Sequence, residues 1–274
     1  MLESAIRCLR PARTRIRESS TGNLRMTTNY DPIAESYVRA KLHPWRHYIE
    51  HYCLKNLIGN PERKDVLDLA CGDGPFTRWV KSEGSARTVG VDLSNRMIDL
   101  AMQREKQAGQ GIEYHVGDAR ALPDLGKFDL VMAAYLLNYA QDDKELADML
   151  RGVARSLRPG GRFVTANANP FFDYSMAPDF RKYGFQVRAE TPFVESSPIT
   201  WTFLLEDGPI EVENYHLSPA SHESALKDCG FCEIRWHLPA VSPEGAMEFG
   251  KDHWRTFLEN APVIFLECRL HSAE

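Results

Sequence analysis

The stretch Val66-Leu67-Asp68-Leu69-Ala70-Cys71-Gly72-Asp73-Gly74-Pro75-Phe76-Thr77 decides how this chain folds. An apolar run that passes through glycines into a helical pattern predicts a buried strand, a tight turn and a helix. Two glycines let the backbone approach a ligand closely, and in open parallel sheets cofactors bind at such a turn, beyond the carboxyl ends of the strands. Asp92 ends the next predicted strand. Its carboxylate is therefore placed to accept hydrogen bonds from two ribose hydroxyls.

The residues of this turn favour a cofactor that carries a positive charge. Asp68 offers a carboxylate to an ammonium group, and we expect Asp73 to repel a pyrophosphate. Pro75 removes a backbone N–H that a pyrophosphate needs at a helix N-terminus. Thr77 replaces the third glycine of the dinucleotide fingerprint. These features predict S-adenosylmethionine, a sulfonium, rather than a nicotinamide dinucleotide.

With this turn and four further stretches, the chain resembles the class I methyltransferase family over about residues 28–170. The matching stretches are residues 68–77, 90–94, 117–119, 128–131 and 157–161. The resemblance implies a Rossmann-like, doubly wound α/β fold, in which a seven-stranded and mostly parallel sheet has an antiparallel last strand. It also implies an enzyme that uses S-adenosyl-L-methionine as its cofactor.

The same resemblance assigns the cofactor contacts. Asp68 and the backbone of residues 70–72 would hold the methionine end, Asp92 the ribose, and Asp118 with Ala119 the amino edge of the adenine. A helical flap over residues 30–46 would cover the cofactor, and its Arg46 would pair with the methionine carboxylate unless it is a solvated surface charge. The predicted cofactor contacts are Tyr30, Tyr37, Arg46, Asp68, Ala70, Gly72, Asp92, Leu93, Met97, Asp118, Ala119 and Ala134.

Apolar runs alternate with helical patterns from residue 30 onward, which predicts a parallel sheet with helices on both faces. We expect a tight turn at residues 158–161. Residues 171–219 break the alternation, and we expect them to form an inserted lid that covers the substrate. The predicted strands are residues 65–70, 88–92, 112–116, 130–134, 162–167, 200–205, 210–216, 233–237 and 263–269, and the predicted helices are residues 76–82, 96–107, 143–157, 221–228 and 243–258.

The predicted acceptor site combines residues after the fourth strand with aromatic residues of the insert. Aromatic side chains with a few polar tips suit a flat heterocycle, although core packing is an equal alternative for Tyr139. The candidate catalytic residues are Tyr135 and His216. The usual pKa of histidine, ~6.5, suits proton removal near neutrality, but His216 is also a candidate surface residue. The predicted substrate contacts are Tyr135, Asn138, Tyr139, Asn169, Phe171, Tyr174, Trp201 and Tyr215.

Residues 133–140 are also similar to the methyltransferases that build toxoflavin-type azapteridines. This closer resemblance implies N- or O-methylation of a heterocyclic or aromatic natural-product intermediate. The fourth strand does not end in the Asn-Pro-Pro-Tyr type sequence of amino-methylating nucleic-acid enzymes, which disfavours DNA as the acceptor. The acceptor and the methylated atom stay open, because a shared fold does not name a substrate.

Composition and charge disfavour several other classes. The 274 residues are 43% hydrophobic and carry a net charge of −5, which suits a globular domain and lacks the basic footprint of nucleic-acid binding. No apolar run approaches the ~20 residues of a membrane-spanning helix. Six scattered cysteines predict a cytoplasmic protein without disulfides. We expect no metal site, because His43, His47 and His51 lack a third ligand type.

Residues 1–25 differ from the rest of the chain, since they hold six arginines against two glutamates. We expect a disordered extension, or a start codon assigned too early, rather than an arginine-rich targeting segment. The methyltransferase domain is then expected to span residues 26–274.

Three other functions stay open. A NAD-dependent oxidoreductase on the same sheet would bind NAD(H) and not S-adenosylmethionine. A non-catalytic S-adenosylmethionine-binding protein would bind the cofactor without turnover, and a methyltransferase for macromolecules is disfavoured by the acidic charge and the aromatic insert. The expected partner is a small-molecule acceptor, with no nucleic acid and no membrane, and the protein is expected to be a monomer or a homodimer.

Overall fold

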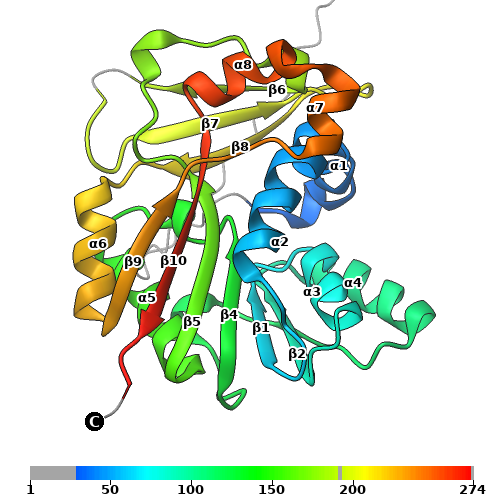
Figure 1. Cartoon of the computed structure of the whole chain (residues 1–274), viewed down its shortest axis with the longest axis vertical. Helices are drawn as coiled ribbons and strands as arrows, with labels where there is room; N and C mark the ends of the chain where they lie inside the picture. The colour runs from blue at the N-terminus through cyan, green and yellow to red at the C-terminus, as the bar shows by residue number, and fades with distance from the viewer. Residues whose placement is uncertain (1–28, 191–192, 273–274) are drawn as a thin grey trace, which may run out of the picture.

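A seven-stranded sheet forms the body of the molecule (Figure 1), and the computed structural model describes residues 29–190 and 193–272. The strand order is β3-β2-β1-β4-β5-β10-β9, in which β1 to β5 are parallel and β10 is antiparallel to both of its neighbours. The predicted fold with its antiparallel last strand is confirmed, while the predicted extension of residues 1–25 lies outside the described residues. The strands are β1 (Asp65–Leu69), β2 (Arg87–Asp92), β3 (Glu113–Val116), β4 (Phe128–Ala134), β5 (Leu157–Ala168), β6 (Phe185–Ala189), β7 (Pro198–Phe203), β8 (Ile210–Tyr215), β9 (Phe231–His237) and β10 (Val263–Leu270).

Helices precede, connect and follow these strands. None of the helices that the structure describes is long and apolar enough to cross a membrane. The α-helices are α1 (Ala34–Ala40), α2 (Tyr52–Ile58), α3 (Pro75–Ser82), α4 (Asn95–Ala108), α5 (Asp143–Ser156), α6 (Pro219–Asp228), α7 (Pro243–Phe249) and α8 (Lys251–Glu259). Shorter helical segments are η1 (Asp31–Ile33), the π-helical η2 (Arg46–His51), η3 (Ala119–Ala121), η4 (Leu137–Tyr139), η5 (Tyr174–Met176) and η6 (Arg181–Tyr183).

Alternating side chains on the central strands explain why helices cover both faces of the sheet. Val66 and Val164 pack with α2 and α3, whereas Leu67 and Phe163 pack with α5 and α6. All four side chains are fully buried, and each contributes about 1.5–3 kcal/mol of hydrophobic stabilisation. Because successive strand residues point to opposite faces, one apolar run supports both layers.

The chain between β5 and α6 forms a second, three-stranded antiparallel sheet, β6-β7-β8, at the end of the molecule farthest from the C-terminus (Figure 1). Aromatic packing holds this lid sheet in place. Phe185 stacks on Trp201 with ring centroids 5.4 Å apart and also contacts Trp45 and Phe257. Helix α1, η2, the insert and α8 therefore share one core, and the chain after the fifth strand does form an insert with its own sheet.

Three details differ from the sequence-based expectation. The tight turn predicted at residues 158–161 is a bulge inside β5, because this strand pairs with β4 on both sides of it. The single helix predicted over residues 243–258 is divided into α7 and α8 by Gly250, whose φ is +77°. Strand β6 was not predicted, although its residues Phe185–Ala189 alternate between apolar and polar side chains.

Candidate functional site

A cavity of about 130 Å³, here called the cofactor cavity, lies where β1, β2 and β4 end. All twelve side chains predicted to contact a cofactor line it, although they lie as far apart in the sequence as Tyr30 and Ala134. The parallel strands explain this convergence, because their carboxyl ends meet at one edge of the sheet.

The turn between β1 and α3 has a backbone that few side chains tolerate. The φ angles are +55° at Ala70, +57° at Gly72 and +76° at Gly74. The φ of +57° favours glycine at position 72, and a Cβ atom there would also displace Nζ of Lys41, which lies 2.7 Å from its position. Such strain is concentrated at functional sites.

Asp68 is buried beneath this turn. Its Oδ2 accepts a hydrogen bond from the Thr77 hydroxyl at 2.6 Å. Burial raises the pKa of the Asp68 carboxyl to about 7, against the opposing effects of Thr77 and Lys41. This carboxyl therefore exchanges its proton near neutrality, and a cationic ligand group would favour its ionised form.

Asp92 is fixed at the end of β2 by two backbone groups. Its Oδ2 accepts the N–H of Gly72 at 2.7 Å, and its Oδ1 accepts the N–H of Ser94 at 2.9 Å. Burial raises the pKa of Asp92, although these two hydrogen bonds oppose that rise. Each oxygen keeps lone pairs for a further donor, so the carboxylate is oriented to accept two hydroxyls from the cavity.

The charge of Asp73 is compensated within the protein. Its carboxylate is nearly fully buried and pairs with Lys41, at 2.8 Å, and with Arg104. The expected repulsion of a pyrophosphate by Asp73 is therefore wrong, because two cations neutralise this carboxylate. Lys41 itself lines the cofactor cavity, which adds a cation that we did not predict.

Arg46 and Glu50 form a buried ion pair on η2, a π-helical segment of the kind often found at functional sites. The Arg46 guanidinium lies 4.3 Å from the ring centre of Trp45 and 5.0 Å from that of Tyr135. The hydroxyl of Tyr135 donates to Glu50 Oε2 at 2.5 Å. Arg46 is thus neither a solvated charge nor free, and Lys41 is the cation better placed for a ligand carboxylate.

Tyr135 follows β4 in an unusual backbone conformation. Its φ is +67°, which is rare for a bulky residue, and its N–H donates to the carbonyl of Ala166 at 2.7 Å. Burial and the Glu50 carboxylate raise the pKa of the Tyr135 phenol well above its ordinary value. Tyr135 is therefore a neutral hydrogen-bond donor at physiological pH.

The predicted flap is tied to α4 and reaches over the cofactor cavity. Asp31 accepts hydrogen bonds from the Ser94 hydroxyl at 2.5 Å and from the N–H of Arg96 at 3.2 Å. The hydroxyl groups of Tyr30 and Tyr139 are hydrogen-bonded to each other. These contacts connect the start of the chain with the sheet on two sides of the cavity.

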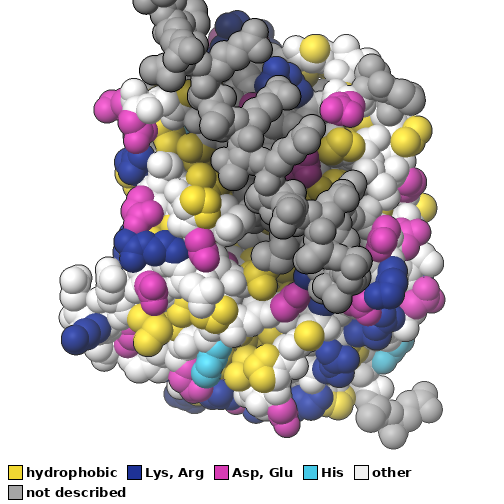
Figure 2. Space-filling model, turned by 180° about the vertical axis from the view of Figure 1, so that it is seen from behind, with side chains coloured by type: hydrophobic (Ala, Val, Ile, Leu, Met, Phe, Trp, Pro, Cys, Tyr) yellow, Lys and Arg dark blue, Asp and Glu magenta, His cyan; other side chains and the backbone are white. Residues whose placement is uncertain are grey.

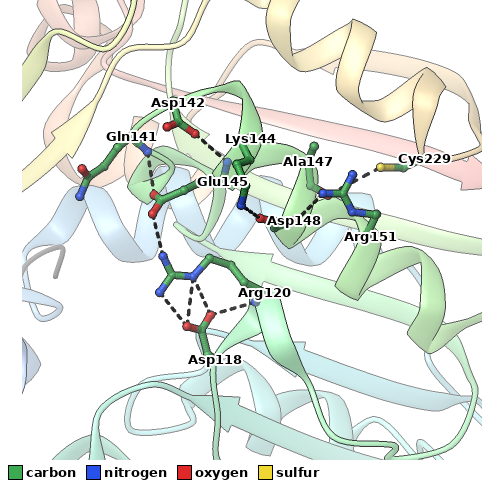
Figure 3. A network of polar contacts seen from close by, with 10 residues as sticks. All are labelled: Asp118, Arg120, Gln141, Asp142, Lys144, Glu145, Ala147, Asp148, Arg151 and Cys229. Atoms are coloured by element: carbon green, nitrogen blue, oxygen red, sulfur yellow. Dashed lines mark hydrogen bonds and ion pairs between the residues drawn. The ribbon is translucent and has the colours of Figure 1, made fainter. Parts of the chain in front are cut away.

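Asp118 is already engaged by a cation that we did not predict. The guanidinium of Arg120 donates to both oxygens of Asp118 and, at 2.8 Å, to Glu145 at the start of α5. Figure 3 shows Arg120 between these two carboxylates. Asp118 and Arg120 both line the cofactor cavity, so this end offers a donor as well as an acceptor.

A second space of about 10 Å³, here called the inner cavity, adjoins the cofactor cavity and shares Tyr37, Arg46, Tyr135 and Tyr139 with it. Asn138 and Trp201, both predicted to contact the substrate, belong to its lining. The other lining residues are Trp45, Phe203, Val212 and Asn214.

The linings of both cavities leave out five of the residues predicted for substrate binding or catalysis, all of which the structure describes. Asn169 is buried and fixes a turn, since its amide donates to the carbonyl of Ala261 at 2.8 Å. Phe171 is 55% exposed. The others pack at the insert's own surface: Tyr174 against Phe193, His216 against Phe193, and Tyr215 through its hydroxyl to Glu213.

Lys41, Glu50 and Arg120 line the cofactor cavity but carried no motif in the sequence. For Lys41 and Glu50, helical spacing from a predicted cofactor contact was the signal that could have identified them. Lys41 is four residues after Tyr37, and Glu50 is four residues after Arg46, so each pair shares one helix face.

Comparison with known proteins agrees with this geometry. Residues 66–161 match the family model of a methyltransferase domain. The cypemycin N-terminal methyltransferase of a Streptomyces species is 34% identical over 129 residues, which are 47% of this chain and 49% of that protein. The N-demethylindolmycin N-methyltransferase of Streptomyces griseus is 28% identical over 180 residues, 64% of this chain and 72% of that protein.

A solved S-adenosylmethionine-dependent methyltransferase from Clostridium acetobutylicum has the same fold. It aligns with a TM-score of 0.62 at 21% identity, covering 89% of this chain and 99% of the other. The chain spans about half the length of several curated relatives that it matches. The sequence relatives establish the domain, and the structural likeness establishes the fold.

Proposed function

We propose that this chain is a class I methyltransferase, which transfers the methyl group of S-adenosyl-L-methionine to a small-molecule acceptor. One observation carries the proposal: Asp68, Asp92 and the strained turn at Gly72 converge on one cavity. Asp68 suits an ammonium group, Asp92 suits two ribose hydroxyls, and Gly72 permits close backbone approach. This donor set fits a nucleoside that carries an amino acid.

The remaining cofactor contacts follow from the lining of the cavity. We assign the methionine carboxylate to Lys41, because Lys41 shares Asp73 with a second cation, Arg104, whereas Arg46 is the cation that pairs with Glu50. Met97 and Leu93 would lie against the adenine. Asp118 would accept the adenine amino group while Arg120 holds the carboxylate in place.

The cofactor supplies a methyl carbon that its sulfonium has already activated, so the protein mainly has to align the acceptor and exclude water. Alignment contributes about 7–11 kcal/mol to such reactions. Tyr30, Tyr37 and Tyr139 enclose the space next to Tyr135. For a hydroxyl or N–H acceptor, the Tyr135 oxygen is placed to take the proton while the phenol hydrogen passes to Glu50.

This proton route replaces the predicted role of His216 as the general base. His216 packs against Phe193 in the insert and lines neither described cavity. Burial lowers the pKa of this imidazole, so it is neutral near pH 7.

An NAD-dependent oxidoreductase is the second candidate function, and two features weigh against it. Pro75 occupies the start of α3, where a pyrophosphate would need a backbone N–H. Asp68 would place a carboxylate beside the cofactor phosphates. Asp73 does not weigh against an oxidoreductase, because Lys41 and Arg104 compensate the charge of its carboxylate.

A small acceptor agrees with the enclosure of the site by the flap and the lid sheet. Over the described part of the rear face, Figure 2 shows Lys and Arg side chains interspersed with Asp and Glu. A nucleic acid needs a concentrated basic surface instead. Cytoplasmic location and a monomeric or homodimeric state stay predictions.

A turnover assay tests the proposed function. The purified chain is incubated with methyl-labelled S-adenosylmethionine and a panel of heterocyclic amides, phenols, amines, a peptide and an oligonucleotide. We expect S-adenosylhomocysteine to form with at least one small acceptor. Labelling of the peptide or oligonucleotide alone would contradict a small-molecule function, and binding without turnover on a broad panel would favour a non-catalytic protein.

A further inference from the structure

Five buried polar atoms without a partner gather around the inner cavity. Within the described residues, they are Nδ2 and Oδ1 of Asn138, Nε of Arg46, and the indole nitrogens of Trp45 and Trp201. None of these four residues is more than 4% exposed. A buried polar atom without a partner destabilises the folded protein, because it has lost its hydrogen bonds to water. Five such atoms on the residues that line one space indicate that a ligand group provides partners for some of them.

We propose that the inner cavity anchors the acceptor by an uncharged amide or lactam group, an assignment that rests on the proposed function. The polar group enters this cavity, and the flat body of the acceptor lies in the cofactor cavity among the shared rings of Tyr37, Tyr135 and Tyr139.

The size of the inner cavity agrees with a small group rather than a whole molecule. Its volume of about 10 Å³ holds about one water molecule. The carbonyl oxygen of an amide has a similar size, so the inner cavity holds this oxygen and the adjoining N–H lies beside it. Because four residues line both cavities, a group in the inner cavity connects directly to a body in the larger one.

The unpartnered atoms define the hydrogen-bonding pattern of the group. Four of them are N–H donors: Arg46, Trp45, Trp201 and the Asn138 amide nitrogen. Such a majority of donors calls for an oxygen with free lone pairs. The Asn138 carbonyl oxygen is the one acceptor among the five, and it needs an N–H. A carbonyl next to an N–H provides both.

The charges around the inner cavity favour an uncharged group. The guanidinium of Arg46 is paired with Glu50, so this cation is already compensated. A carboxylate in the inner cavity would add a second buried anion near Glu50, which costs free energy unless a further cation pairs with it. We therefore assign an amide rather than a carboxylate.

Binding of three matched probes tests the proposal without requiring turnover. Benzamide, benzoate and toluene have the same ring and differ in the group that would enter the inner cavity. Each is titrated into the full chain with and without saturating S-adenosylhomocysteine, and binding is measured by calorimetry. We expect benzamide to bind about ten-fold more tightly than benzoate or toluene.

Two variants locate the site. Asn138→Leu keeps the side-chain size and removes both polar atoms, and Trp201→Phe keeps a ring and removes the indole N–H. Each should weaken benzamide binding about ten-fold and leave the affinity for S-adenosylhomocysteine unchanged. Trp236→Phe is the matched control, because its indole donates to Glu223 outside both cavities. Asn138→Leu should not lower the melting temperature, since it removes atoms that have no partner.

The outcomes separate this inference from the proposed function. If S-adenosylhomocysteine binds but benzamide binds no better than toluene, or benzoate binds best, the amide assignment is overturned. Equal benzamide affinity in Asn138→Leu and in the parent chain would also overturn the amide assignment. The inner cavity would then be a site for one water molecule. If S-adenosylhomocysteine does not bind, the proposed function fails, while the probe series without it still tests the inner cavity.

Discussion

At the scale of single residues, Asp68 connects cofactor binding to pH. Its pKa is raised from an ordinary 3.8 to about 7 by burial, so this carboxyl is largely protonated at pH 6 and largely ionised at pH 8. The ammonium of the cofactor needs the ionised form. We expect the affinity for S-adenosylhomocysteine to fall about ten-fold from pH 8 to pH 6, measured by calorimetry.

The same shift predicts the opposite pH dependence for stability. A raised pKa means that the folded state prefers the protonated carboxyl. The contribution of Asp68 to the free energy of unfolding is therefore fully present below pH 3.8 and is lost as the pH rises through about 7. Asp68→Asn should abolish the pH dependence of binding and remove this loss of stability. Asp228→Asn, at an exposed position on α6, is the matched control. An Asp68→Asn chain that keeps full affinity would contradict the assignment.

Asp92 provides a second prediction at this scale. Asp92→Ala should weaken S-adenosylmethionine binding by about 1.5–3 kcal/mol, the range for hydrogen bonds to a charged group. Asp92→Asn keeps one acceptor oxygen and should lose less. The melting temperature of each variant is the control, because Asp92→Ala also removes the acceptor for the N–H groups of Gly72 and Ser94. An unchanged dissociation constant in Asp92→Ala would refute the ribose assignment.

Among single residues, sequence reasoning found those that belong to a motif and missed those that act through tertiary contacts. Asp68 and Asp92 follow predicted strands, and strand ends are readable from the apolar pattern. Glu50 and Arg120 gain their meaning from partners 85 and 25 positions away, Tyr135 and Glu145. No local pattern encodes such partners.

At the scale of elements, the flap is fixed to α4 by Asp31. Asp31→Ala removes the acceptor for the Ser94 hydroxyl and the Arg96 N–H. A net hydrogen bond of about 0.5–1.5 kcal/mol predicts that S-adenosylhomocysteine dissociates about three- to ten-fold faster in stopped flow. Asp31→Asn keeps an acceptor oxygen and should behave like the parent chain. An unchanged dissociation rate in Asp31→Ala would show that η1 does not close the site.

The central strands β1, β2 and β4 were predictable because each is a mostly buried run of residues with a clear end. The edge strands β3 and β9 are only partly buried. The predicted boundaries differ from the structure where tertiary pairing decides. Residues 158–161 read as a turn and yet lie within β5, because β4 pairs on both sides of them. Asn169, beside the insert, and Phe171, within it, were predicted to face the substrate, but residue type alone does not say which way a side chain points.

At the scale of the whole molecule, one core joins the start of the chain, the lid sheet and α8. The rings of Trp45, Phe185 and Phe257 contact one another, although Trp45 and Phe257 lie more than 200 positions apart in the sequence. The flap and the lid sheet, which contribute residues to the cavities, are therefore held by a core that α8 completes. Such closure suits a reaction that must exclude water from a small acceptor.

The central claim is that this closed site holds S-adenosylmethionine. Calorimetric titration of the purified chain with S-adenosylmethionine, S-adenosylhomocysteine and NADH, side by side, tests it most directly. We predict that the first two bind and NADH does not. Binding of NADH alone would contradict the claim and identify the chain as an oxidoreductase on the same sheet.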